Sequence, residues 1–384
     1  MLPYSSAFLR LLLPACTAFA LTPTASADVP AGRLALLTRG VNLSHWFSQV
    51  PTEGGAYRHE WFATYNRTDD LHQLAAAGFR HVRFPVEFEM FIDEERPDAL
   101  REEFLPDFDR ALDAMLASGL AVIVDWHARE DTKERLREDD AFVTQATLMW
   151  RAMARHLAAR DPGRVFFETM NEPAGGMSLE RWAAIQSGFV GAIRAEAPTH
   201  TIIISPHQWS SITELVKLPP LLDDNLVYNF HFYEPMVFTH QSAAWPGMGL
   251  EPIAQLRYPA EKTSLAENLA RVGDGRGREF LLDYRADRAW LAARLQQAAD
   301  WAAKHGVPLT CNEFGVFIPV TPVADRMAWL RDTRQLLEQL GIGWSMWDYA
   351  GGFGVTAKPH DENNRTLDPA VLQALGLPER LGKR

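Results

Sequence analysis

Two glutamates, Glu172 and Glu313, each follow a short apolar run and are each directly preceded by an asparagine. The first lies in the segment VFFETMNEP, where an apolar run leads into Asn171, Glu172 and Pro173. An apolar run that ends at a proline is typical of a buried strand, because proline cannot continue a hydrogen-bonded ladder. A carboxylic acid at such a strand end, beside an amide, could act as a positioned general acid. Taken alone, the short match is more typical of a strand end followed by a helix cap.

Polar and aromatic residues recur at the ends of other apolar runs. They are Arg83, Asp125, His127, His231, Tyr233, Glu313, Trp347 and Asp348. The side-chain period of two along a strand would place His231 and Tyr233 on one face, and likewise Cys311 and Glu313. We therefore expect Cys311 to be a buried thiol beneath Glu313.

Two carboxyl groups that meet at one face of a fold are what cleavage of a glycosidic bond requires. One must stay protonated while the other is ionised. Arg83 near Glu313 would favour the anion by opposite charge, and Tyr233 could donate a hydrogen bond to it. Glu313 therefore suits a nucleophile, and Glu172 is left as the acid and base.

Four further residues could position a substrate. Asn171 could bond the 2-hydroxyl of a sugar, a contact that tightens in the transition state. His127 and His231 could orient the acid and the substrate. Trp347 offers a flat face on which a sugar ring could stack.

Each of these residues has a simpler explanation when it is considered alone. Arg83 could form an ion pair, the two histidines could be satisfied core residues, and Trp347 could fill the core. A metal site on His127, His231 and a glutamate is a sharper alternative, but no His-x-x-x-His spacing accompanies a glutamate here. Since all these residues fall at strand ends, we expect one shared site without a metal or another cofactor.

Strand-like runs alternate with helical periodicity along the chain. The runs cover residues 36–43, 81–86, 121–126, 165–169, 201–205, 226–232, 309–314 and 343–347. Helical patterns cover residues 68–77, 106–118, 142–159, 179–196, 286–305 and 325–340, with a last helix over 369–375. This alternation predicts an α/β fold, a single (β/α)8 TIM barrel, in which the strand C-termini gather the candidate residues at one face.

Composition limits the class of protein and its partners. The 384 residues are 47% hydrophobic and 23% charged, as in ordinary globular proteins. The net charge of −11, with no basic cluster, disfavours nucleic acid and anionic membrane surfaces as partners. Twelve tryptophans are an excess, and tryptophan serves both core packing and sugar binding. Those near strand ends are Trp46, Trp126, Trp209, Trp344 and Trp347.

The N-terminal segment, residues 1–27, resembles a secretory signal, with Arg10 before an apolar stretch and small residues at 25–27. We expect a secreted or periplasmic protein whose mature part, residues 28–384, is one catalytic domain. The alternative is a lipoprotein anchored at Cys16. After cleavage only Cys311 would remain, so no intrachain disulfide is expected. No later run is long and apolar enough to span a membrane, and we expect a monomer.

Two loops are distinctive. One follows the first strand, over residues 42–61, and the other is the long sixth-to-seventh connection, residues 234–284. Loops as long as the second are usually functional or disordered. Within it, residues 238–241 together with Trp245 could extend a cleft or close one end of it.

From about residue 39 to 351 the chain resembles glycoside hydrolase family 5, the large cellulase family of clan A barrels. The resemblance rests on the order of Arg-Phe-Pro, Asn-Glu-Pro, His-x-Tyr, Asn-Glu-Phe-Gly and a late tryptophan. It implies eight active-site positions, which are Arg83, His127, Asn171, Glu172, His231, Tyr233, Glu313 and Trp347. It also implies that Glu172 is the proton donor and Glu313 the nucleophile of a retaining mechanism without a cofactor.

The resemblance leads us to expect an endo-β-1,4-glucanase that acts on polysaccharide or oligosaccharide. Another β-glycan is the alternative within enzymes: mannan, mixed-linkage glucan or a bacterial exopolysaccharide. A non-catalytic carbohydrate-binding barrel and a structural envelope protein are alternatives from other classes. Both glutamates and all their partners are present, which disfavours these last two.

Overall fold

The computed structural model describes residues 28–52, 54–93, 95–173, 175–358, 361 and 365–378. The expected signal segment and Cys16 lie outside these residues. Within these ranges, no helix has both the length and the apolar character that a membrane span requires.

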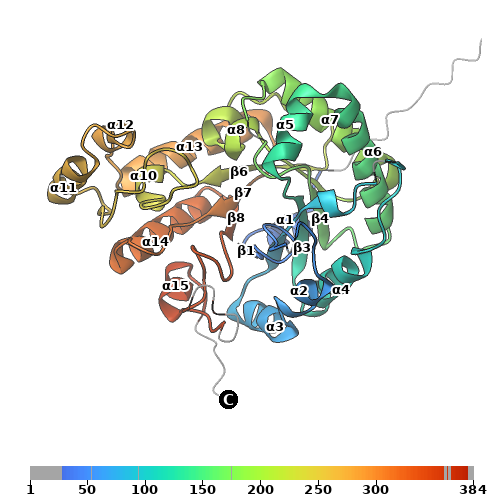
Figure 1. The fold of residues 1–384 in the computed structure, drawn as a ribbon, viewed down its shortest axis with the longest axis horizontal. Coiled ribbons are helices and arrows are strands. Elements are labelled where there is room, and N and C mark those ends of the chain that lie inside the picture. The colour runs from blue at the N-terminus through green and yellow to red at the C-terminus, as the bar shows by residue number, and fades with distance from the viewer. Residues whose placement is uncertain are drawn as a thin grey trace, which may run out of the picture.

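Eight parallel strands close into a barrel in sequence order, with the first strand paired to the last (Figure 1). The strands are β1 (Gly40–Asn42), β2 (His81–Val86), β3 (Ala121–Trp126), β4 (Val165–Glu168), β5 (Ile202–Ile204), β6 (Leu226–Phe232), β7 (Leu309–Phe314) and β8 (Gly343–Met346). The predicted (β/α)8 TIM barrel is confirmed. Four strands, β2, β3, β6 and β7, have the predicted bounds, because each is a mainly apolar run typical of a parallel strand buried on both faces.

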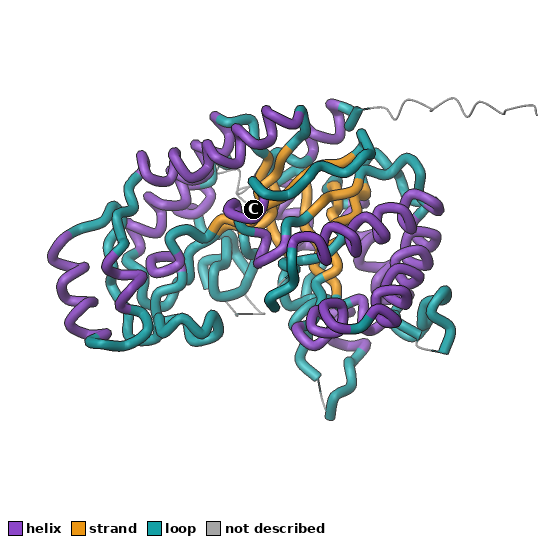
Figure 2. Tube along the Cα trace, turned by 90° about the horizontal axis from the view of Figure 1, so that it is seen from above, coloured by secondary structure: helices purple, strands orange, loops and turns teal. Residues whose placement is uncertain are grey.

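Helices surround the barrel (Figures 1 and 2). They are α1 (Ala31–Leu36), α2 (His59–Thr64), α3 (Thr68–Ala77), the short 3₁₀ helix η1 (Phe88–Met90), α4 (Leu105–Ala117), α5 (Glu130–Glu138), α6 (Asp140–Leu157), α7 (Leu179–Glu196), α8 (His207–Ser210), α9 (Ile212–Leu215), α10 (Met236–Thr239), α11 (Lys262–Val272), α12 (Arg278–Leu282), α13 (Arg288–His305), α14 (Val323–Gln339) and α15 (Pro369–Ala374). The predicted helices all form, and those over 68–77 and 179–196 have the predicted bounds. Helix α15 follows the barrel, as expected from residues 369–375.

The first predicted strand was placed too early. Residues 31–36 form helix α1, and β1 begins only at Gly40. Leu36, the first residue of the predicted strand, is the last residue of this helix, and with Leu34 it packs against a core cluster that includes Ile123 from β3. Helix α1 therefore contributes to the barrel core from outside the sheet.

The connection between β6 and β7 is not a structureless loop. It contains the helices α10, α11 and α12, which form a lobe at the left of Figure 1 and at the left end of Figure 2. Helices α10 and α12 have only four and five residues, and glycine and proline interrupt the sequence around the eleven-residue α11, so periodicity did not reveal them.

The prediction that Cys311 is a buried thiol is confirmed, but its position beneath Glu313 was wrong. Pairing of β6 with β7 runs from Phe230–Cys311 directly to His231–Glu313, so Asn312 is an extra residue at a β-bulge. Cys311 instead belongs to the large core cluster that also contains Phe230 and Trp344. The bulge interrupts the period of two, and both Asn312 and Glu313 reach partners in the barrel interior.

Candidate active site

Arg83 is the centre of the site. It lies within β2, fully buried, and its guanidinium contacts residues that lie on four other strands or just beyond them. The partners are Asn42 Oδ1 at 3.0 Å, Asp125 Oδ2 at 3.0 Å, Glu168 Oε1 and Oε2 at 2.8 Å each, Asn171 Oδ1 at 2.9 Å and Glu313 Oε1 at 2.6 Å. Burial alone would lower the pKa of Arg83, but the surrounding carboxylates Asp125, Glu168 and Glu313 raise it well above its usual value.

Glu313 is held by two donors. Its Oε1 accepts from Arg83, and its Oε2 accepts from the Tyr233 hydroxyl at 2.8 Å. Burial has the largest effect and raises the pKa of Glu313, although His231 and Arg83 act to lower it. Because a cation and a phenol both donate to this carboxylate, we assign the anion to Glu313.

Glu172 comes four residues after the last residue of β4, Glu168, and has a φ of 43°, a conformation that is rare outside glycine. Such strained residues cluster at functional sites. The Glu172 side chain is 23% exposed, and its Oε1 lies 2.8 Å from His231 Nδ1. Burial raises the pKa of Glu172, against the opposing charge of Lys133. The pKa values of both glutamates are raised, so the assignment rests on the donors: Arg83 and Tyr233 donate to Glu313, which leaves Glu172 to carry the proton of a general acid.

The two glutamates face each other across His231. One oxygen of each and one nitrogen of His231 all lie within 4.8 Å of one another. Burial lowers the pKa of His231 to about 4, so its imidazole is neutral at neutral pH. The carboxyl groups of Glu172 and Glu313 are therefore close together, with the uncharged imidazole of His231 next to both.

The remaining three expected residues form a chain beside this pair. Asn171 Nδ2 lies 3.4 Å from His127 Nε2, and His127 Nδ1 lies 3.0 Å from Asp125 Oδ2. The His127 ring stacks on Trp347 with a centroid distance of 5.7 Å and an interplanar angle of 13°. Burial lowers the pKa of His127 to about 3. The structure thus brings all eight expected residues into one connected site.

A second layer of polar residues lies beneath the eight and was not predicted from the sequence. Glu168 is fully buried and accepts hydrogen bonds from Asn229 Nδ2 at 3.2 Å and Asn312 Nδ2 at 2.7 Å, besides its two from Arg83. The sequence did contain a sign of this layer, because Glu168 is a charged residue in an otherwise apolar strand. A buried carboxylate must have hydrogen-bond or ionic partners. With Asn42 and Asp125, these residues hold Arg83 in place.

Glu172, His231 and Glu313 also have the ligand types and spacing of a metal site. This trio differs from the alternative considered above because it does not include His127. The Arg83 guanidinium lies 2.6 Å from Glu313, so a fixed positive charge would repel a cation held by this trio. The Tyr233 hydroxyl also donates to Glu313, and both contacts favour a pair of carboxyl groups over a metal centre.

Of the tryptophans near strand ends, some pack in the core and others are more exposed. Trp46, Trp126 and Trp344 are buried in the core, as expected for most tryptophans. Trp347 is 9% exposed beside the site, and Trp209 is 57% exposed. Position near a strand end therefore did not distinguish tryptophans of the core from Trp347 of the site.

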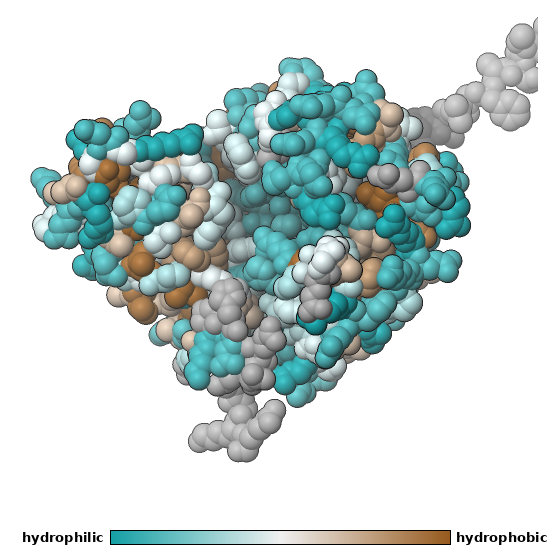
Figure 3. Space-filling model, in the orientation of Figure 1, coloured by the Kyte–Doolittle hydropathy of each residue, from teal (hydrophilic) through white to brown (hydrophobic). Residues whose placement is uncertain are grey.

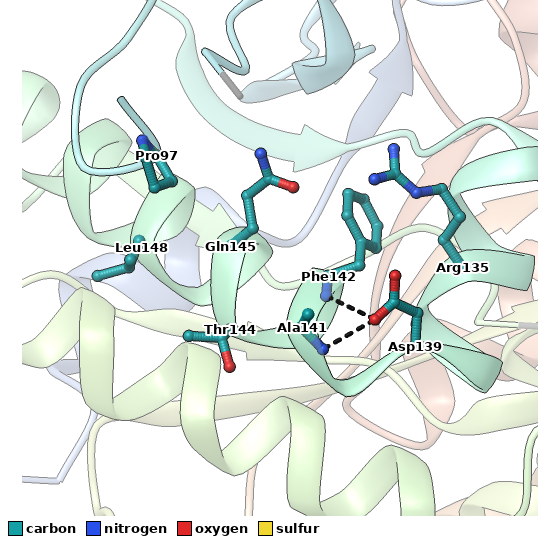
Figure 4. Close-up of a pocket in the computed structure, with 8 residues that line it drawn as sticks. All are labelled: Pro97, Arg135, Asp139, Ala141, Phe142, Thr144, Gln145 and Leu148. Atoms are coloured by element: carbon teal, nitrogen blue, oxygen red, sulfur yellow. Dashed lines mark hydrogen bonds between the residues drawn. The ribbon is translucent and has the colours of Figure 1, made fainter. Parts of the chain in front are cut away.

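A separate hollow of about 370 Å³ lies on the outer side of α5 and α6 (Figure 4). Asp139 on its wall accepts hydrogen bonds from the backbone of Ala141 and Phe142 and so caps α6. The Arg135 guanidinium lies 3.8 Å from the centre of the Phe142 ring. None of the residues that line this hollow belongs to the site.

Comparisons with known proteins agree with the geometry. Residues 44–352 match the family described as Cellulase (glycosyl hydrolase family 5). Endoglucanase C of Acetivibrio thermocellus is 30% identical over 317 residues, which cover 81% of this chain and 90% of that protein. Cellodextrinase A of Ruminococcus flavefaciens is 24% identical, over 80% of this chain and 83% of that protein.

Solved structures show the same fold. The cellulose synthase subunit Z of Clostridioides difficile has a TM-score of 0.69 and 25% identity, with coverage of 88% of this chain and 99% of that one. The family match over residues 44–352 spans nearly the whole barrel and includes all eight expected residues. The chain therefore belongs to glycosyl hydrolase family 5, the cellulase family, and is a glycoside hydrolase.

Proposed function

We propose that the chain is a retaining hydrolase that cleaves β-1,4-glucan within the polymer. The observation that carries this proposal is the paired carboxyls, Glu172 and Glu313, with one oxygen of each within 4.8 Å of the other. Retaining glycosidases place their carboxyl groups about 5–5.5 Å apart, whereas inverting enzymes need about 6.5–9.5 Å to admit a water.

The first half of the reaction follows from this geometry. Glu313 Oε2 or Oε1 attacks the anomeric carbon and forms a glycosyl ester, while the bond to the leaving oxygen breaks. Glu172 gives its proton to that oxygen, so the departing sugar leaves as an alcohol. Arg83 and Tyr233, which donate to Glu313 at 2.6 and 2.8 Å, keep the attacking carboxylate ionised and oriented.

In the second half of the reaction, Glu172 acts as a base. Glu172, now a carboxylate, takes a proton from a water that attacks the anomeric carbon of the ester. The ester bond breaks, the electron pair returns to Glu313, and the sugar leaves with its original configuration. Asn171 is joined to Glu313 through Arg83 and suits a contact to the 2-hydroxyl, while Trp347 supplies a face for the reacting sugar.

The substrate class follows from the relatives. Endoglucanase C and the other endoglucanases among them are named for internal cleavage of glucan. Mannan is the alternative, because the Cel5A of Thermotoga maritima, whose fold this chain shares at 24% identity and a TM-score of 0.69, is described in complex with mannotriose as substrate. A non-catalytic barrel is disfavoured, since the acid, the nucleophile and their donors are all in place.

We propose further that residues 1–27 direct export and that the enzyme meets its polymer outside the cytoplasm. This rests on the N-terminal pattern of one arginine, an apolar stretch and small residues at 25–27. Mass spectrometry of the N-terminal peptide of the exported form tests it. A start at Asp28 supports a cleaved signal, whereas a start at a lipidated Cys16 contradicts cleavage after residue 27.

The mechanism is tested by following the anomeric protons of the products by NMR during hydrolysis of a soluble oligosaccharide. The β-anomer should form first and then mutarotate. First formation of the α-anomer would contradict the retaining mechanism.

A further inference from the structure

Asp125 lies near the C-terminal end of β3 but has no part in the proposed reaction. It is fully buried, as is Arg83, whereas Asn171 is 4% exposed and the His127 side chain is 11% exposed. Figure 3 shows a hollow with a hydrophilic floor, coloured teal, near the position of β6 in Figure 1. A sugar that enters the site can touch Asn171 and His127 but not Asp125. Any effect of Asp125 on the reaction must therefore pass through its neighbours.

The amide of Asn171 can point in only one direction. Its oxygen accepts from Arg83 Nη2 at 2.9 Å, and a guanidinium only donates hydrogen bonds. The other end of the amide is therefore Nδ2, which lies 3.4 Å from His127 Nε2. Nδ2 has two N–H groups, and no described residue other than His127 accepts from it. Its second N–H is thus available to a ligand.

This orientation fixes the tautomer of His127. Because Nδ2 of Asn171 is a donor, Nε2 of His127 must accept and cannot carry a proton. Burial lowers the pKa of His127 to about 3, so the neutral ring has a single N–H, which must be on Nδ1. Nδ1 lies 3.0 Å from Asp125 Oδ2 and donates to it. Asp125 therefore supplies the acceptor that this tautomer requires.

The Oδ2 atom of Asp125 can act only as an acceptor. It lies 3.0 Å from Arg83 Nη2 as well as 3.0 Å from His127 Nδ1. Burial raises the pKa of Asp125 to about 7, against the charges of Arg83 and Lys133. A proton taken up by this carboxyl would reside on Oδ1, away from the Arg83 cation, so Oδ2 accepts in either state.

The remaining contacts of Asp125 and His127 favour a role in the reaction over a role in folding alone. Asp125 Oδ1 is buried and accepts no hydrogen bond from the described residues. A carboxylate that only stabilised the fold would be expected to use both oxygens, because an unsatisfied buried polar atom costs stability. The His127 ring also stacks on Trp347 at an interplanar angle of 13°, which fixes the plane in which its Nε2 meets Asn171.

We propose that Asp125 is a positioning residue for recognition of the 2-hydroxyl of the sugar at the cleavage point. By holding the proton of His127 on Nδ1, it makes Nε2 an acceptor. That acceptor holds the Asn171 amide with one N–H turned to the substrate. This inference rests on the proposed function, in which Asn171 contacts the 2-hydroxyl. It adds to the site a residue that the substrate itself does not touch.

Two variants separate the hydrogen bond of Asp125 from its charge. Asp125→Asn and Asp125→Leu both remove the charge and are close to aspartate in size, but only asparagine keeps an oxygen in the position of Oδ2. Asp107→Leu is the matched control. Asp107 on α4 is also buried and also contacts a histidine and an arginine, His59 and Arg110, outside the site.

The substrates are 4-nitrophenyl β-cellobioside and its analogue that lacks the 2-hydroxyl on the glucosyl unit bonded to nitrophenol. The ratio of their kcat/KM values measures the preference for the 2-hydroxyl. We expect Asp125→Leu to lower this ratio about tenfold, because the contact to the 2-hydroxyl strengthens in the transition state. Asp125→Asn and Asp107→Leu should keep the ratio within about twofold of the unaltered enzyme. Lost charge beside Arg83 would slow both substrates alike and leave the ratio unchanged.

A double variant tests whether Asp125 acts through Asn171. Asn171→Ala should lower the same ratio, since it removes the amide that meets the 2-hydroxyl. Adding Asp125→Leu to Asn171→Ala should lower the ratio no further, because residues that act through one contact are not additive. A further fall of about tenfold in the double variant would show that Asp125 acts independently of Asn171 and would overturn the proposal.

The tautomer is measured without activity, by NMR of protein in which histidine is labelled with ¹⁵N. The variant His127→Phe assigns the signal. We expect the proton of His127 on Nδ1 in the unaltered enzyme and in Asp125→Asn, with a share on Nε2 in Asp125→Leu. A proton on Nε2 in the unaltered enzyme would overturn the proposal.

An unchanged ratio in a folded Asp125→Leu variant would also overturn it. If this variant does not fold, His127→Phe takes its place, because phenylalanine keeps the stack on Trp347 but cannot accept from Asn171. An unchanged ratio in His127→Phe would have the same meaning. An unaltered enzyme that cleaves neither glycoside would contradict the proposed function instead, while the tautomer still decides the role of Asp125.

Discussion

At the scale of single residues, the site depends on one buried arginine shared among several carboxylates. Arg83 contacts Asp125, Glu168 and Glu313, so one positive charge faces three acidic groups. Breaking such a buried network by removing one partner leaves uncompensated charge, which is strongly unfavourable. This arrangement gives Glu313 a permanent donor and leaves Glu172, on the other side of His231, as the group that can carry a proton.

The acid role of Glu172 predicts a loss that depends on the leaving group. Glu172→Ala should reduce hydrolysis of glucan by about 10²–10⁴-fold, the usual contribution of a general acid. The first step on an aryl glycoside with a good leaving group should be spared far more, because that group departs without a proton. Burst and steady-state rates on both substrates measure this, with the exposed Glu102→Ala as control. Equal loss on both substrates would remove Glu172 from the acid role.

Lys133 predicts a shift of the pH profile. This lysine on α5 is 4% exposed, its Nζ lies 2.8 Å from Glu130, and its charge lowers the pKa of Glu172. Lys133→Met removes a charge that stabilises the Glu172 anion, so the pKa of Glu172 should rise. Since activity needs the protonated acid, the alkaline limb of kcat/KM should move to higher pH.

The control for this shift is Lys217→Met, an exposed lysine on the β5–β6 connection. It should leave the profile in place. A Lys133→Met profile that coincides with that of the control would show that Lys133 does not act on Glu172.

At the scale of elements, two departures from regular structure determine where side chains point. The bulge in β7 makes Asn312 an additional residue and lets Glu313 as well as Asn312 reach the interior. The left-handed backbone at Glu172 turns the chain after β4. Neither follows from hydrophobic periodicity, which assumes an unbroken alternation, and this is why Cys311 was placed on the wrong face.

Close packing at the base of β1 predicts opposite effects for two glycine substitutions. A Cβ on Gly40 would lie 2.1 Å from the His81 ring, and that ring is fixed by hydrogen bonds to Leu36 O and Ser345 Oγ. Gly40→Ala should therefore lower the free energy of unfolding by about 1–3 kcal/mol.

Gly191 in the middle of α7 is the matched control, since a Cβ there meets nothing within 4 Å. Gly191→Ala should raise the free energy of unfolding by about 0.5–1 kcal/mol, because alanine loses less entropy in a helix. Urea unfolding of both variants measures the two effects. A Gly40→Ala protein as stable as the unaltered one would contradict the close packing described for His81.

At the scale of the whole molecule, the barrel and the convergence of the eight expected residues could be predicted from sequence. The barrel follows from repeated alternation of strand and helix patterns, and the site follows from the rule that parallel strand ends meet at one face. The supporting layer could not be predicted in the same way. Glu168, Asn229 and Asn312 are single polar residues within strands, and only the closed barrel shows that they converge on Arg83.

The β6–β7 connection, residues 234–284, could be predicted only in part. Its length and its tryptophan were visible in the sequence, but the helices α10, α11 and α12 and the contacts of Trp245 depend on tertiary packing.

The central claim is that Glu172 and Glu313 cleave β-glucan together, and the most direct test measures reducing-end release with product sizes. The substrates are a soluble cellulose derivative, mixed-linkage glucan, mannan and xylan, and the unaltered mature chain is compared with Glu313→Ala. We predict that the unaltered enzyme cuts glucan into mixed oligosaccharides, while Glu313→Ala remains folded and inactive. A Glu313→Ala variant that retains most of the activity, or an unaltered enzyme that cuts none of the glucans, would contradict the account.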